Sequence, residues 1–287
     1  MDVSLIICSH NRDQQLTLGL ASVARIQSDL AWELIVVGSC PTAETTAAIS
    51  RFFIDHREIR GLHVTEGEGG VSRARNAGVR SSRGAIIAMI DDDCYAAPDL
   101  IDRVWEAFAD PRIGFVGGRV LLHDPKDYPI TIQESEEAEH FKPWSAVPGG
   151  IMHGANMAFR REAILGIGGF DEEFGPGARF PGAGEDWDAM ARVCATGWAG
   201  GYSPRPTVRH HHGRDAAAAA ALLVKYHYGS GVVFCKLATS EDKSIRRLFI
   251  RHWARRTLGD IKGGHYLKLV QQFRGALAYR RAKRGTR

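Results

Sequence analysis

The first 120 residues alternate between short apolar runs and amphipathic stretches. Apolar runs of strand length predict strands covered on both faces, over residues 3–8, 33–37, 62–64, 85–90 and 113–122. Apolar positions at helical spacing predict helices between them, over residues 13–26, 42–53, 71–80 and 98–108. This alternation predicts an α/β fold with a mostly parallel central sheet flanked by helices. Ligands of such sheets bind beyond the carboxyl ends of the strands, so we expect the functional residues at that edge.

The second half of the chain is less regular. Residues 123–153 form an acidic, proline-containing stretch, which we interpret as an insertion over the site. The next segment, 166–184, is rich in glycine and has the composition of a mobile lid. A helix is predicted over residues 185–196, and a strand and turn lead into the histidines 210–212.

Charge separates the end of the chain from the rest. We predict an α/β domain over residues 1–213 and a basic helical C-terminal region over residues 214–287. The whole chain has a net charge of +4, but residues 243–287 hold 14 Lys or Arg and a single acid, Asp260. The first 242 residues are left with 23 bases and 32 acids, a net charge of −9. A mildly acidic body with a basic tail predicts an electrostatic task for the tail.

Three adjacent carboxylates, Asp91, Asp92 and Asp93, close the predicted strand 85–90. Like charges at the mouth of a buried strand repel one another and need a compensating cation. Hard divalent ions such as Mg²⁺ or Mn²⁺ bind carboxylate oxygens and bridge to phosphates. We therefore predict a metal site here, with a solvated acidic turn as the alternative.

Two further groups of residues carry candidate chemistry. Glu185 and Asp186 open a predicted helix, where carboxylates are favoured for capping alone. Our interpretation is that one of them points into the site as a general base. One of the three consecutive histidines is a candidate metal ligand or phosphate donor, with a structural role as the alternative. We take His211 as the candidate, and the choice among the three stays open.

The ordered set of motifs resembles family 2 of the inverting glycosyltransferases, which have the GT-A fold, a Rossmann-like α/β architecture. The matching segments are 4–12 (SLIICSHNR), 74–78 (ARNAG) with 90–98 (IDDDCYAAP), 154–161 (GANMAFRR) with 168–171 (GGFD), and 184–188 (GEDWD). Together they span roughly residues 3–212. The resemblance implies transfer of a sugar from a nucleotide-sugar, with UDP-sugars expected first, to an acceptor hydroxyl on a glycan or a lipid-linked molecule.

The resemblance also implies roles for individual residues. Asp91 and Asp93 would form the DxD motif, in which Asp93 holds Mn²⁺ or Mg²⁺ on the donor diphosphate and Asp91 or Asp92 contacts the ribose or metal waters. Asp186 matches the catalytic base, with Glu185 beside it. The residues expected to line the donor pocket are Cys8, Ser9, His10, Asn11, Arg12, Gly38 and Arg75.

Gly38 departs from the family, whose members usually carry an aspartate there that accepts a hydrogen bond from uracil. This departure leaves nucleotides other than uridine open. On the acceptor side, the candidates are Asn156, Trp144 and Trp187. Trp144 either stacks on a sugar face or fills core.

A carboxylate base and a single displacement predict inversion of the anomeric centre. A nucleotidyltransferase that makes a nucleotide-sugar is the alternative enzyme. It predicts a loop rich in glycine and lysine after the first strand, where residues 9–12 read SHNR. An inactive, transferase-like binding module is the alternative outside catalysis.

The basic tail and the cysteines suggest where the protein acts. Basic residues recur among Leu248, Phe249, Ile250, Trp253 and Leu258, a composition typical of an interfacial anchor on an anionic membrane. An anionic acceptor and a solvated helical face are the alternatives, and no motif indicates nucleic-acid binding. Five cysteines without paired spacing, no signal peptide and no apolar run of membrane-spanning length predict a cytoplasmic protein, peripheral on the inner face of the membrane.

Overall fold

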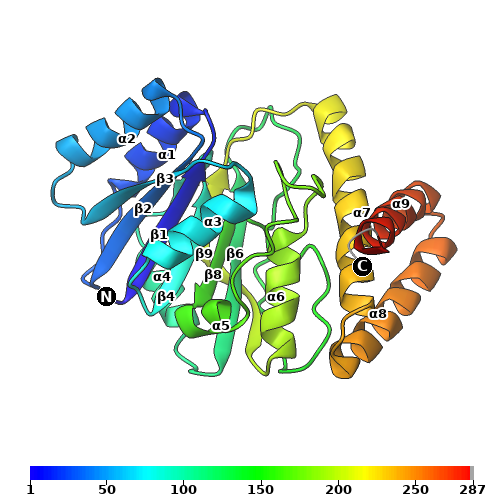
Figure 1. The fold of residues 1–287 in the computed structure, drawn as a ribbon. Helices are drawn as coiled ribbons and strands as arrows, with labels where there is room; N and C mark the ends of the chain where they lie inside the picture. Colours follow the sequence, from blue (N-terminus) through cyan, green and yellow to red (C-terminus); the bar gives the residue numbers. More distant parts are fainter. Residues whose placement is uncertain (285–287) are drawn as a thin grey trace.

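A computed structural model describes residues 1–284, and its centre is one mixed sheet with the strand order β3-β2-β1-β4-β8-β6-β9-β5 (Figure 1). The strands are β1 (Val3–Ser9), β2 (Trp32–Ser39), β3 (Gly61–Glu66), β4 (Ile86–Asp91), β5 (Cys94–Ala96), β6 (Ile113–Leu122), β7 (Glu139–Phe141), β8 (Asn156–Arg160) and β9 (Ala199–His210). β1 to β4 are parallel to one another, so their carboxyl ends share one edge. β8 is antiparallel to both β4 and β6, whereas β6 and β9 are parallel. The prediction of a mostly parallel central sheet is confirmed.

Helices cover both faces of the sheet because successive side chains of each buried strand point to opposite faces. Leu5 and Ile7 pack with residues of α1 (Asp13–Val23), α2 (Ala43–Asp55) and α4 (Leu100–Ala107). Ile6, between them, packs into the cluster that holds α3 (Val71–Ser81), α5 (Arg161–Gly166) and α6 (Glu185–Ala195). The apolar runs noted in the sequence are therefore strands buried on both sides.

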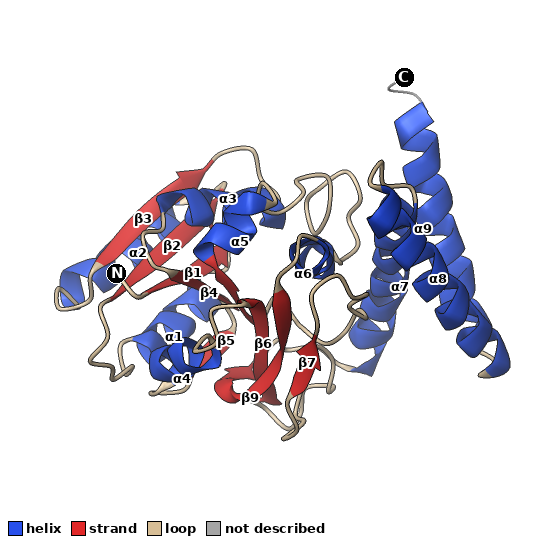
Figure 2. Ribbon diagram, turned by 90° about the horizontal axis from the view of Figure 1, so that it is seen from below, coloured by secondary structure: helices blue, strands red, loops and turns tan. Residues whose placement is uncertain are grey.

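Three helices, α7 (Ala216–Ala238), α8 (Lys243–Lys262) and α9 (Tyr266–Arg284), stand beyond α6 and away from the first strands (Figures 1 and 2). α7 and α9 approach closely at Gly231 and Gly275. A side chain at either glycine would clash with the backbone of the facing helix. Phe249 of α8 and Tyr279 of α9 belong to the same hydrophobic cluster as Ile6 of the sheet. The core thus continues across the predicted boundary between residues 213 and 214.

The C-terminal region is helical, as predicted, and residues 285–287 of the predicted range lie outside the described part of the chain. Within residues 1–284, none of the helices combines the length and the apolar character that crossing a bilayer requires.

The sequence patterns located five strands and five helices of the α/β part at nearly their observed positions. They gave no element for β8 and α5, which lie between the irregular stretch 123–153 and residue 167. The segment 123–153 contains one short strand, β7, paired with β9, and is otherwise irregular. Its exposed acidic residues gave no apolar periodicity from which the pairing could be predicted.

Candidate active site

Strand register brings the two predicted donor-binding segments together at one edge of the sheet. Cys8 at the end of β1 pairs with Asp91 at the end of β4, and Ser9 pairs with Gly38 at the end of β2. Because all three strands are parallel, the loops that follow them leave from the same edge. Residues far apart in the sequence therefore meet where the fold class predicts a ligand site.

The three aspartates occupy different environments. The side chain of Asp91 is 38% exposed, whereas Asp92 and Asp93 are buried. Arg12 donates from one nitrogen to Asp92 Oδ1 at 2.8 Å and from another to Asp93 Oδ2 at 2.6 Å. Ser9 Oγ donates to Asp92 Oδ2 at 2.6 Å. Burial, opposed by Arg12 and Ser9, raises the pKa of Asp92 to about 7.

His210 is the histidine that lies on Asp93, with Nε2 3.3 Å from Asp93 Oδ1. Pairing of Cys94 in β5 with His210 in β9 sets this contact. Burial alone would raise the pKa of Asp93, but the hydrogen bond and charge of His210, with Arg12, hold it well below its ordinary value. Burial would lower the pKa of His210, and the neighbouring carboxylates Asp93 and Asp91 raise it instead.

The residues around Asp93 fit a divalent cation. Asp93, Cys94 and His210 offer ligand atoms that all lie within 4.8 Å of one another. Within the described chain, His210 Nδ1 is buried without a hydrogen-bond partner, and the contact of Asp93 Oδ1 is the 3.3 Å one with His210 Nε2. Burial raises the pKa of the Cys94 thiol well above its ordinary value, so this group stays protonated and is a poor ligand. The donors left for the metal are carboxylate oxygens, together with the imidazole of His210 once the cation has displaced its proton.

His211 takes a different position from the one expected for a metal ligand. Its Nδ1 lies 3.0 Å from the Tyr95 hydroxyl, and its ring centroid is 5.0 Å from that of His123. Its backbone N–H donates to the carbonyl of Asp93. Adjacent residues of an extended strand point to opposite sides, so His210 and His211 cannot both face Asp93.

Arg75 of α3 joins the two acidic motifs. One of its nitrogens is 2.7 Å from Glu185 Oε1 at the start of α6, and another is 3.5 Å from Asp91 Oδ1. The guanidinium is buried, and Glu185 and Asp91, with Asp186, counter the burial and raise the pKa of Arg75. The fold therefore places the head of α6 beside the end of β4, although almost 100 residues separate them.

Asp186 is held by two backbone donors. Trp187 N–H donates to its Oδ1 at 2.7 Å, and Gly154 N–H donates to its Oδ2 at 3.1 Å. Desolvation, followed by the charge of Glu185 and opposed by Arg75, raises the pKa of Asp186 to about 7. A carboxylate with a pKa near neutrality is suited to accept a proton at neutral pH.

The other predicted donor-side residues lie around the ends of β1 and β2. His10 is exposed, with Nδ1 2.7 Å from the carbonyl of Ser39. The side chain of Asn11 accepts from Thr42 N–H and so joins the loops after β1 and β2. Gly38 has no room for the family's aspartate, because a Cβ there would lie 2.9 Å from Pro41 carbons and 3.3 Å from Nε2 of His63.

The three predicted acceptor-side residues are placed apart from one another. Asn156 is buried and donates to the carbonyls of Arg119 and Pro206. Trp187 is buried against Phe234.

The side chain of Trp144 is 68% exposed, and its backbone N–H donates to the carbonyl of Cys194. That end of α6 is about 15 Å from Glu185 at 1.5 Å per residue. Trp144 therefore lies at the far end of α6 from Asp186, the ring of Trp187 packs on Phe234, and the acceptor-side assignments stay predictions.

Two residues near the site were not singled out from the sequence. His63 of β3 has a buried Nε2 without a partner among the described residues and a lowered pKa caused by burial. Tyr226 of α7 shares a hydrogen bond with Thr131, and its pKa is raised to about 12 by burial and then by the charges of Asp186 and Asp91. Neither belongs to a motif, so only the fold could find them.

Family comparison agrees with this geometry. The profile of Glycosyl transferase family 2 matches residues 4–167, and that of Glycosyl transferase family group 2 matches residues 86–274. A glucosyl-dolichyl phosphate glucuronosyltransferase of Haloferax volcanii is 26% identical over 189 residues, which are 61% of this chain and 58% of that protein. The succinoglycan biosynthesis protein ExoO of Rhizobium meliloti is 30% identical over 105 residues, 37% of this chain and 29% of that protein. The chain thus spans less than two thirds of the length of both relatives.

Solved structures share the fold at low sequence identity. The mannosyltransferase PcManGT of Pyrobaculum calidifontis, in complex with GDP-Man and Mn²⁺, superposes with a TM-score of 0.66 at 20% identity, covering 99% of this chain and 75% of that one. S. aureus TarS 1-349 in complex with UDP-GlcNAc gives a TM-score of 0.63 at 15% identity, covering 91% and 75%. With a family match over more than half of its length and a GT-A architecture, the chain belongs to glycosyltransferase family 2.

Proposed function

We propose that the chain transfers a sugar from a nucleoside-diphosphate sugar, with UDP-sugars as first candidates, to a hydroxyl of a glycan or lipid-linked acceptor, with inversion. The observation that carries this proposal is the buried Arg75, which contacts Asp91 and Glu185 and so holds the donor-side and base-side carboxylates at one edge of the sheet. The acceptor class is supported by the Haloferax volcanii relative, whose name describes a dolichyl phosphate-linked substrate.

In such a transfer, one set of residues would bind the metal and another would accept the proton. Asp93 and His210, with Asp91, would hold Mn²⁺ or Mg²⁺, which when bound neutralises the charge that develops on the leaving diphosphate. Arg12 keeps Asp93 in place from the other side. Asp186 accepts the proton of the acceptor hydroxyl as the new bond forms at the opposite face of the sugar, which inverts the anomeric centre.

The proposal is tested by incubating the protein with a panel of sugar nucleotides and measuring release of the nucleoside diphosphate. We expect release that depends on an added acceptor and on Mn²⁺ or Mg²⁺, and that stops in EDTA. Formation of a nucleotide-sugar from a sugar phosphate would instead indicate the nucleotidyltransferase. Nucleotide binding without turnover of any donor would indicate a binding module.

We further propose that the C-terminal helices contact an anionic membrane surface. Large apolar side chains are exposed on α8 and α9 at helical spacing, at Ile250, Leu258, Ile261, Tyr266, Leu267, Val270, Phe273 and Leu277. The exposed basic side chains near them include those of Arg247, Arg251, Arg255, Arg274 and Arg281. Apolar faces next to basic side chains are typical of interfacial helices. A second copy of the same basic surface would be repelled, which favours lipid as the partner.

Two of the anchor residues named from the sequence point inward. Phe249 is fully buried, and Trp253 stacks on Phe234 of α7 with ring centroids 5.6 Å apart. Both contacts belong to the core between α7 and α8. Deleting residues 243–287 would therefore expose the apolar side of α7, so point substitutions on the exposed face test the membrane proposal better.

Replacing Leu267 and Phe273 with serine is expected to weaken binding to vesicles of mixed neutral and anionic lipid by about 10-fold or more. Full burial of one such side chain is worth roughly 1.5–3 kcal/mol, and the two are 66% and 68% exposed. Co-sedimentation at low and high salt measures the effect, since added salt screens the basic side chains. Ile54→Ser on α2, at a residue 62% exposed, is the matched control. Equal sedimentation of the double variant and the unchanged protein would refute the anchor.

A further inference from the structure

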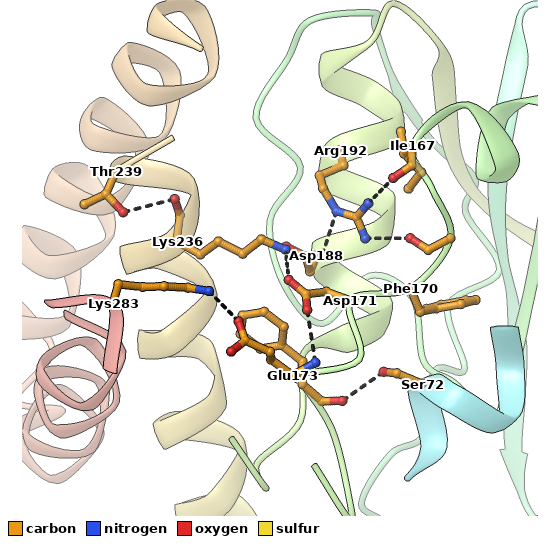
Figure 3. Close-up of polar contacts among 12 residues, drawn as sticks. Ser72, Ile167, Phe170, Asp171, Glu173, Asp188, Arg192, Lys236, Thr239 and Lys283 are labelled. Atoms are coloured by element: carbon orange, nitrogen blue, oxygen red, sulfur yellow. Dashed lines mark hydrogen bonds and ion pairs between the residues drawn. The ribbon is translucent and has the colours of Figure 1, made fainter. Parts of the chain in front are cut away.

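A second cluster of charges, partly buried around the fully buried Asp188, lies between α6 and α7, and the proposed chemistry does not use it (Figure 3). Lys236 of α7 places its Nζ 2.6 Å from Asp171 Oδ2 and 2.7 Å from Asp188 Oδ1. Arg192 donates from Nε to Asp188 Oδ2 at 2.7 Å. Asp188 is fully buried, so it depends on these two cations for its stability as a carboxylate.

The partners of Lys236 lie in α6, which carries the proposed base Asp186, and in the loop that precedes α6. Asp171 belongs to the glycine-rich segment 166–184, and Asp188 lies in the first turn of α6, two residues after Asp186. Arg192 extends the connection, because it also donates to the carbonyls of Ile167 and Gly169 at 2.7 and 2.8 Å. One side chain of α7 thus fixes both the loop before α6 and the helix itself.

Two further contacts support the same junction. The rings of Trp187 and Phe234 meet edge to face with centroids 4.7 Å apart, one residue after Asp186 and two residues before Lys236. The backbone of Gly229 lies directly on the 182–184 segment, where any side chain at Gly229 would clash with Ala183. Ion pairs, an aromatic contact and a close backbone contact therefore all join α7 to the residues around Asp186.

α9 reaches the same segment independently. Lys283 Nζ lies 2.6 Å from Glu173 Oε2, and Tyr279 packs on the rings of Phe174 and Phe180. Figure 3 shows Lys236 and Lys283 approaching the segment from neighbouring helices. The glycine-rich segment, which the sequence suggested as a mobile lid, is thus supported along its length by the C-terminal helices.

We propose that Lys236 is a positioning residue. It holds the start of α6 and residues 167–175 in the geometry that aims Asp186 at the acceptor hydroxyl. This role rests on the proposed function. The C-terminal helices then belong to the catalytic unit. Lys236 has no contact with Asp91, Asp92 or Asp93 among the interactions of residues 1–284, so donor binding does not depend on it.

The test is Lys236→Met, which keeps the length of the side chain and removes its charge. We expect kcat to fall by ~10-fold or more, because a small misplacement of a reacting group can cost up to about 10²-fold. KM for the sugar nucleotide should change less than about threefold, since the residues of the proposed donor site are unchanged. Lys236→Arg keeps the cation and should retain most of kcat. Lys225→Met, exposed on the same helix, is the matched control.

Hydrogen exchange gives a readout that is independent of any donor. In Lys236→Met we expect faster exchange at residues 167–175 and 185–190, with unchanged protection in β1 and β4. Unchanged kcat, or faster exchange spread evenly over the whole fold, would overturn the positioning role. If the unchanged protein transfers no sugar, the proposed function fails, and the exchange pattern still decides whether Lys236 orders this segment.

Discussion

Replacing Asp186 by asparagine is expected to lower the rate of sugar transfer by about 10²-fold or more, the scale of general-base loss. Asparagine has nearly the same size and can keep one of the two hydrogen bonds that now hold the carboxylate, because its single carbonyl oxygen can accept from Trp187 N–H or Gly154 N–H but its NH2 group cannot accept from the other. It cannot take a proton from the acceptor. Because Asp186 has no contact with Asp91, Asp92 or Asp93 among the interactions of the described chain, affinity for the donor should change little.

The pH dependence of sugar transfer by the unchanged enzyme is a second test of Asp186. The pKa of Asp186 is raised to about 7, by desolvation first and by Glu185 next, so the base is protonated and inactive in acid. Transfer should therefore rise with pH through a transition near 7 and level off above it. The Asp186→Asn variant should lose this transition in its residual rate.

Glu185→Gln is the matched comparison, because it alters the neighbouring carboxylate and its ion pair with Arg75. We expect it to act through the position of Arg75 and to lower the apparent pKa of Asp186, since it removes a nearby negative charge. Near-normal turnover in Asp186→Asn would refute the assignment and move the base to Glu185, since Asp188 is engaged by Lys236 and Arg192.

Asp93→Ala is expected to abolish turnover and metal-dependent nucleotide binding while the fold persists. It removes the carboxylate that His210 and Arg12 hold in place, and with it the central oxygen ligand of the proposed cation site. Arg12 keeps Asp92 as a partner, so its charge stays paired. Calorimetric titration with UDP and GDP, with and without Mn²⁺, measures the binding, and circular dichroism reports the fold.

Asp110, a partly exposed aspartate paired with Arg112, provides the control for the loss of a carboxylate. Asp110→Ala should bind and turn over donor as the unchanged protein does. Full activity in EDTA, or Mn²⁺-dependent binding that survives in Asp93→Ala, would contradict the metal site. His210→Ala should weaken Mn²⁺-dependent binding more than His211→Ala, because His210 is the histidine beside Asp93.

The sequence predicted those parts of the molecule that local patterns encode. Buried parallel strands are continuous apolar runs, so β1, β2 and β4 and the residues at their ends could be located from the chain alone. The same patterns gave Asp91 to Asp93 and the start of α6 at Glu185. The proximity of these two motifs depended on the fold class and on the family resemblance.

What could not be predicted depends on register and on long-range packing. Which histidine of 210–212 meets Asp93 follows from the pairing of β9 with β5, and a shift of one residue would have presented His211 instead. The orientation of Trp187 is set by Phe234, almost 50 residues later. Trp253 was expected on the lipid side because its neighbours are basic, and the packing of α8 on α7 turns it inward.

The contact between α7 and the head of α6 has a consequence for the order in which the protein matures during synthesis. Chains emerge from the ribosome N-terminus first, and early segments can begin to fold before later ones exist. Asp91 to Asp93 and their Arg12 partner emerge within about the first third of the chain, whereas His210, the other partner of Asp93, emerges after Asp186. Lys236 and Lys283, which support the surroundings of Asp186, come last. A nascent chain is thus expected to hold every residue of the proposed donor site before it holds the helices that support transfer.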